Sequence, residues 1–131
     1  MENITTCSND NKKPYLAIKK LKVPMYSCEI QFIIADDINP VLDKIYKKFN
    51  IPGKFEGEAE GIVFSPDLDL YFILINKQYL SHNTIAHEIY HTTLRIVDDR
   101  EIDDEEQGAW LNGWIAESMY KFLKKKNLEI K

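Results

Sequence analysis

The segment TIAHEIYHTTL, residues 84–94, contains two histidines four positions apart, and a glutamate directly follows the first. Successive residues of an α-helix turn by about 100°, so His87 and His91 lie within about 40° of each other, one turn apart. Two imidazoles in this arrangement can point at one metal ion. Glu88 lies about 100° around the helix from His87, where its carboxylate can reach a water on the metal without being a ligand. The segment therefore has the HExxH pattern of a hydrolytic zinc site.

The same histidines could instead be ordinary side chains on the surface of a helix, so the context of the motif has to decide. Ile85, Ile89 and Ile96 fall at about 160° to 200° from His87 on a helical wheel, where they can anchor the helix to a core. The two histidines then face away from this apolar stripe. That orientation is the one that a metal site on a packed helix requires.

A catalytic zinc ion uses three protein ligands and one water, so the motif needs a further ligand. The position six residues beyond His91 is Val97, which excludes a third histidine at that spacing. Asp98 lies on the histidine face but about 10 Å along the helix axis from His91, too far for direct ligation. The remaining source is the following helix, where Glu105 and Glu106 stand in the first turn and face directions about 100° apart.

The motif and the segment after it resemble a known family. TIAHEIYH, followed after a short acidic gap by EEQGAWLNGWI, resembles small phage-encoded zinc peptidases and, more distantly, the ImmA/IrrE-type zinc metallopeptidases. In that wider family HExxH provides two zinc ligands and the base, and a glutamate three residues before a helical alanine provides the third ligand. The resemblance implies that His87, His91 and Glu106 bind Zn²⁺, with Ala109 as the matching alanine, and that Glu88 is the catalytic base.

This resemblance covers about residues 60–118 and has one further implication. It implies that the strand LYFILIN, residues 70–76, binds an extended substrate by strand addition, although the same strand could lie in the interior of the sheet. A zinc enzyme often also has a Tyr, His or Arg that stabilises the transition state. The sequence leaves four candidates open for that role, which are Tyr71, Tyr79, His82 and Tyr90.

The elements that must position the motif follow from the spacing of apolar residues. Residues 28–36 are β-branched and aromatic and predict a strand, and residues 38–50 have helical spacing. GIVFS and LYFILIN flank the turn sequence PDLD and predict a β-hairpin. Helices are predicted over residues 84–97 and 104–125. This order indicates an α+β fold with the helices packed on one face of a small, antiparallel-containing sheet. The resemblance implies that this fold is a minimal zincin-like domain, with an N-terminal helix, an HExxH helix and a long C-terminal helix.

The chain has 131 residues, which is enough for one compact domain. Residues 1–14 are polar and predict a flexible N-terminal arm, which leaves residues 15–131 as a single zincin-like metallopeptidase domain. Its two cysteines, Cys7 and Cys28, form no CxxC pair, which indicates a reducing compartment and no cysteine-based metal site. We find neither a signal peptide nor an apolar run of about 18 residues, so we expect a cytoplasmic protein without a membrane partner.

The net charge of −4 gives no electrostatic footprint for nucleic acid. The expected function is that of a gluzincin-like zinc metallopeptidase (a hydrolase) acting on a peptide or protein, encoded by a phage and present in the host cytoplasm or the virion. The first alternative is a non-catalytic structural or interaction protein, virion-associated or directed against a host defence, that retains the zincin scaffold. The second is a hydrolase of cell-wall peptide crosslinks. Substrate, oligomeric state and the role of residues 1–25 do not follow from the sequence.

Overall fold

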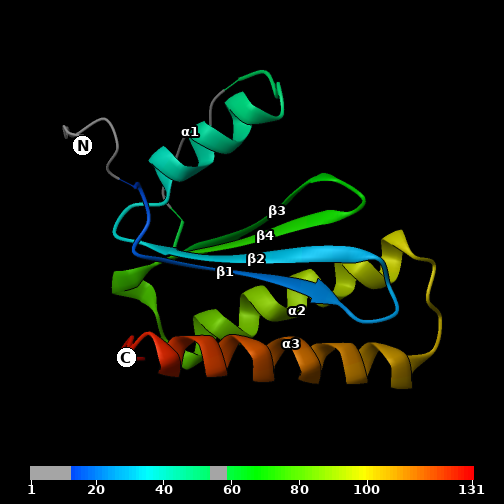
Figure 1. The fold of residues 1–131 in the computed structure, drawn as a ribbon. Coiled ribbons are helices and arrows are strands. Elements are labelled where there is room, and N and C mark those ends of the chain that lie inside the picture. The colour runs from blue at the N-terminus through cyan, green and yellow to red at the C-terminus, as the bar shows by residue number, and fades with distance from the viewer. Residues whose placement is uncertain (1–12, 54–58) are drawn as a thin grey trace, which may run out of the picture.

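The computed structural model describes residues 13–53 and 59–131 (Figure 1). The described elements are β1 (Ala17–Val23), β2 (Cys28–Ala35), α1 (Asn39–Lys48), β3 (Gly61–Asp67), β4 (Leu70–Asn76), the short 3₁₀ turn η2 (Lys77–Tyr79), α2 (His82–Asp99) and α3 (Glu105–Lys125). Of the predicted N-terminal arm, residues 1–12 lie outside the described part. The α+β class and the predicted strand, hairpin and three helices are confirmed.

The described strands form one mixed sheet in the order β1-β2-β4-β3. β1 pairs with β2 and β3 pairs with β4 in antiparallel fashion, whereas β2 and β4 are parallel. The sequence analysis did not predict β1, AIKKLKV, because its three lysines make it look like a solvated basic segment. It is an edge strand, in which exposed lysines are compatible with pairing on one side only.

The helices cover both faces of the sheet, with α1 on one face and α2 and α3 on the other (Figure 1). The expectation that all helices pack on one face is therefore wrong for α1. Strand β2 shows the physical reason, because its buried side chains point to both sides. Phe32 and Ile34 belong to the core under α2 and α3, and Ile33 and Ala35 belong to the core under α1. A strand that is apolar on both faces needs a cover on each.

Helix α2 begins after Ser81, whose side-chain oxygen accepts a hydrogen bond of 3.1 Å from the backbone N–H of Thr84. This N-cap starts the helix two residues earlier than the apolar periodicity predicts. The predicted anchoring stripe is confirmed, since Ile85, Ile89 and Ile96 are all buried against the sheet. The stripe fixes the rotation of α2 about its axis and leaves His87 and His91 exposed.

Helix α3 runs alongside α2 in the opposite direction (Figure 1). A Cβ on Gly108 would lie 3.8 Å from the side chain of Val97, and Thr93 Oγ1 donates a hydrogen bond of 2.8 Å to Asn112 Oδ1. These two contacts define the register of the helix pair. No helix of the described residues is both long and apolar enough to cross a membrane.

At the far end of α2, the phenol of Tyr71 on β4 donates a hydrogen bond of 2.5 Å to Asp99 Oδ2. Tyr71 is fully buried, and this burial, together with the carboxylate of Asp99, raises the pKa of the phenol far above its ordinary value. The bond ties the C-terminal turn of α2 to the centre of the sheet.

We expect Tyr71→Phe to lower the free energy of unfolding by about 1–2 kcal/mol, because Asp99 loses a buried donor. Since the folded-state pKa of Tyr71 is raised, the stabilisation is fully present below the ordinary tyrosine pKa of about 10 and is lost as the pH rises above it. Urea titration between pH 7 and pH 11 measures both effects. Tyr79→Phe, at an exposed site, is the matched control, and equal unfolding free energies of wild type and Tyr71→Phe would contradict this role.

Candidate metal centre

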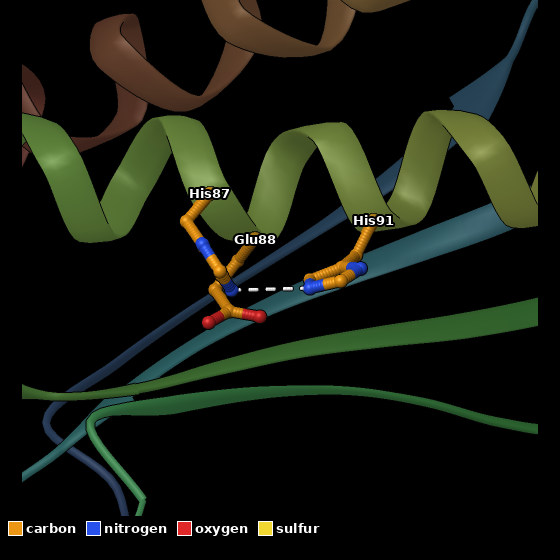
Figure 2. A group of neighbouring side chains, drawn as sticks. All are labelled: His87, Glu88 and His91. Carbon is orange, nitrogen blue, oxygen red and sulfur yellow. Dashed lines mark hydrogen bonds between the residues drawn. The ribbon is translucent and has the colours of Figure 1, made fainter.

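The side chains of His87, Glu88 and His91 lie together on one side of α2 (Figure 2). The Nε2 atoms of His87 and His91 are 3.1 Å apart, with one ring nitrogen placed to donate a hydrogen bond to the other. One potential ligand atom from each of the three residues lies within 4.8 Å of the others, and they form the only such group of His, Cys, Asp or Glu among the described residues. The predicted helical geometry of HExxH is therefore present.

The two imidazoles fit a zinc ion. Zinc binds histidine nitrogen at about 2.0–2.1 Å, so two nitrogens on a tetrahedral zinc lie about 3.4 Å apart. The observed separation of 3.1 Å between the two Nε2 atoms differs from this by a few tenths of an ångström, within reach of small rotations of the rings. The rings are exposed on the solvent side of α2, so an ion has access to them.

Glu88 differs from the histidines because its side chain is buried, with 6% of its surface exposed. It lies against the start of β3, where a Cβ on Gly61 would be 3.1 Å from both Cγ and Oε2 of Glu88. The absence of a side chain at Gly61 therefore lets α2 approach the edge strand at this point. No described residue donates a hydrogen bond to the carboxylate. Burial raises the pKa of Glu88, His87 and His91 lower it, and Glu60 raises it again, so that it lies above the ordinary value.

Glu106, the predicted third ligand, lies elsewhere. It is exposed in the first turn of α3, where its backbone N–H donates to Asp104 Oδ1. The contacts of Gly108 with Val97 and of Asn112 with Thr93 set a register that places Glu106 level with Asp99, eight residues beyond His91 and so about 12 Å along α2. The structure does not bring Glu106 to the histidine pair, and its role as a ligand stays a prediction from the resemblance.

The two alternative acids are also remote from the histidines. Glu105 lines a groove between α2 and α3 together with Leu94 and Ala109. Asp98 is exposed near the C-terminal end of α2, about two turns beyond His91. Neither belongs to the group formed by the two histidines and Glu88.

The four candidates for transition-state stabilisation have other surroundings. Tyr71 is bonded to Asp99, at the opposite end of α2 from His87. The ring of His82 stacks on Tyr120 with its Nδ1 atom 3.1 Å from the phenol oxygen. Tyr79 and Tyr90 are exposed and line two other pockets. None of these side chains is hydrogen-bonded to a residue of the HExxH group.

The predicted substrate strand LYFILIN is β4, which lies between β2 and β3. Both of its edges are already paired, so the expectation that a peptide adds to it is wrong. The edge strand beside α2 is β3, whose outer side is unpaired among the described residues. The apolar run of LYFILIN signals this interior position, because its residues from Tyr71 to Asn76 are buried.

A pocket of about 340 Å³ opens beside His87 and Glu88. Its remaining lining residues are Glu60, Gly61, Asn83 and Thr84. The sequence analysis singled out neither Glu60 nor Gly61 for the site. Their local pattern shows only that Glu60 precedes the expected strand GIVFS and that Gly61 begins it. Only the packing of β3 against α2 brings them to the motif.

In comparisons with known proteins, the chain matches no protein-family model, no curated protein and no solved structure at a significant level. The residues of the site and their geometry therefore carry the functional argument.

We expect the purified protein to hold about one zinc ion per chain. Elemental analysis of His87→Ala and His91→Ala should show most of the metal lost, because each variant removes one of the two converging nitrogens. His82→Ala is the matched control, since its ring stacks on Tyr120 outside the group. Full zinc content in both site variants would remove the histidine pair from metal binding.

We expect Gly61→Ala to destabilise the fold by about 1–3 kcal/mol through overpacking against the Glu88 side chain and the backbone carbonyl of Leu74. The destabilisation should be smaller in the Glu88→Ala background, which a double-mutant cycle measures by chemical unfolding. Gly113→Ala is the control, because its Cβ meets no atom within 4 Å. This control should stabilise the exposed helical site by up to about 1 kcal/mol. Equal effects of Gly61→Ala in both backgrounds would contradict the close contact.

Proposed function

We propose that the protein is a zinc-dependent metallopeptidase of minimal zincin-like architecture. The observation that carries the proposal is the convergence of two histidine nitrogens, 3.1 Å apart, beside the buried carboxylate of Glu88. Ligands and base thus come from one helix whose rotation is fixed by its buried stripe. The raised pKa of Glu88 also suits a group that must accept and release a proton during the reaction.

The roles of the residues follow from their chemistry. His87 and His91 would bind Zn²⁺, which when bound supplies Lewis-acid polarisation of a carbonyl and an acidified water. Glu88 would accept the proton of the attacking water and transfer it to the amine that leaves. Its burial between α2 and β3 holds the carboxylate in one place and limits its solvation.

The edge strand β3 provides a surface for an extended substrate. Its unpaired side can add a peptide strand through backbone hydrogen bonds, and the strand starts at Gly61, directly beside Glu88. A peptide paired with β3 would pass the site with its backbone extended. We therefore propose β3, in place of β4, as the strand that binds the substrate.

The alternative function is a non-catalytic interaction protein that retains the zincin scaffold. One observation favours this alternative. Among the described residues, the two histidines are joined only by Glu88, which is the proposed base, and no further protein ligand is beside them. Zinc titration of Glu106→Ala separates the possibilities. A strong loss of affinity would make Glu106 a ligand and require α3 to shift along α2, whereas unchanged affinity would leave the site with the two histidines.

We expect Glu88→Gln to retain zinc and strongly slow hydrolysis, because an amide can neither accept nor deliver the proton. The loss should be about 10²-fold to 10⁴-fold, the usual contribution of a general base. The measurement is cleavage of a mixed peptide library, followed by mass spectrometry with zinc content determined in parallel. Glu117→Gln, on the exposed face of α3, is the matched control. Zinc binding by the wild type without cleavage of any library member would favour the non-catalytic alternative.

A further inference from the structure

The pocket beside the HExxH group has an acidic wall that the proposed hydrolysis does not use. Glu60 stands directly before β3, and it lines both this pocket and a neighbouring cavity of about 540 Å³. Asp36 and Asp37 also line the neighbouring cavity. Among the described residues, neither lining includes a lysine or an arginine. The described linings of the two cavities thus contain carboxylates and no lysine or arginine, a composition that favours a positively charged ligand.

The backbone of Glu60 is held in a defined position. Asn76, at the end of β4, donates from its backbone N–H to the carbonyl of Glu60 at 3.0 Å, and its side-chain Nδ2 donates to the carbonyl of Ala59 at 2.6 Å. The Asn76 Oδ1 atom accepts from the N–H of Ile38 at 2.9 Å, which ties this segment to the start of α1. All of these bonds involve Asn76, and they hold the backbone of residues 59 and 60 beside the end of β4, which defines the position from which the Glu60 side chain extends.

The Glu60 carboxylate itself retains free acceptor capacity. Its one hydrogen bond with a described side chain is a long one, 3.4 Å from the hydroxyl of Thr84 on α2. A carboxylate offers about four acceptor positions, so most remain for a ligand. The pocket is also lined by Glu88, a residue that is more than nine-tenths buried and to whose carboxylate no described residue donates. Glu60 is exposed, so water can satisfy its carboxylate, whereas Glu88 is buried. An ammonium group, with its positive charge and three donors, is complementary to a pocket lined by these two carboxylates.

The acidic wall does not form a metal site with three or more protein ligands among the described residues. The carboxylates of Glu60, Asp36 and Asp37 do not converge, since the group of His87, Glu88 and His91 is the only one among the described residues with ligand atoms within 4.8 Å. A primary ammonium group places fewer demands on geometry, because it has three donors and can bind one carboxylate while the others contribute through their charge.

We propose that Glu60 binds a primary ammonium group of the substrate next to the scissile bond. This inference rests on the proposed peptidase function, since only a peptidase has a scissile bond. The binding of the ammonium group itself needs no zinc. Gly61 follows Glu60 and lies so close to Glu88 that a Cβ on it would be 3.1 Å from Glu88 Oε2, so an ammonium group held by Glu60 lies within a short reach of the proposed base. The ammonium group belongs either to the N-terminus of the peptide or to a lysine side chain. Glu60 would bind the positively charged –NH₃⁺ group that both of them have.

The test is an NMR titration of the full chain in the presence of a chelator, so that hydrolysis does not consume the probe. The probes are trialanine amide with a free N-terminus, its N-acetylated form and N-acetyl-lysine amide. At least one ammonium probe should shift the amide signals of Gly61 and Thr84 and bind about tenfold or more tightly than the acetylated trialanine amide. The probe that binds more tightly identifies the source of the ammonium.

Glu60→Gln should weaken binding of that probe about tenfold or more, because it removes the charge and keeps the shape. Glu105→Gln, which makes the same charge change in the α2–α3 groove, should leave it unchanged. Equal binding of acetylated and free probes, or equal binding by Glu60→Gln and wild type, overturns the proposal. Loss of zinc from Glu60→Gln also overturns it, since Glu60 would then be a ligand. Failure of zinc binding or hydrolysis in the wild type rejects the peptidase function but leaves the titration result intact.

Discussion

The burial of one stripe of α2 on the sheet is the contact on which the rest of this structure depends. Ile85, Ile89 and Ile96 are at most 2% exposed, and burial of each contributes about 1.5–3 kcal/mol. This stripe fixes the rotation of the helix, which in turn decides the direction of every other side chain on it. His87 and His91 then face solvent, Glu88 faces β3, and Thr93 and Val97 face α3. A rotation of α2 large enough to move the histidines would expose the isoleucines.

The second constraint is the fit between α2 and the edge strand. Glu88 is a charged residue type in a nearly buried position, and such groups are expensive unless they are paired. Gly61 leaves room for this carboxylate, and Asn76 ties the segment before the strand to β4 and α1. Burial of the Glu88 carboxylate costs free energy, and contacts made by the neutral residues around it hold it in this position. This pattern is typical of functional sites, where local cost is offset by the surrounding structure.

The two halves of α2 differ in the residues that they carry. The N-terminal half carries the HExxH group and borders the acidic pocket, whereas the C-terminal end is fastened by the bond between Tyr71 and Asp99. α3 runs along both halves of α2; Gly108 leaves room for Val97, and Asn112 accepts a hydrogen bond from Thr93. Its first turn therefore lies near the fastened end, which separates Glu106 from the histidines.

The sequence by itself determined the periodic elements and the local geometry of the motif. The turn of an α-helix follows from the backbone alone, so the convergence of His87 and His91, the position of Glu88 and the opposing isoleucine stripe could all be predicted. The hairpin and α3 were predictable for the same reason, since their apolar spacing is local. Strand β1 was missed because edge strands can be rich in lysine and lack a distinct apolar pattern.

Only the tertiary structure decided which elements meet. The sequence shows that the side chains on both faces of β2 are apolar. Which face α1 covers depends on how the chain crosses between the parallel strands β2 and β4. The interior place of β4, the separation of Glu106 from the histidines and the arrival of Glu60 beside them are likewise set by contacts between residues far apart in the chain. When a second element contributes a ligand or a pocket wall, its position depends on strand order and helix register. Neither of these leaves a periodic pattern in the local sequence.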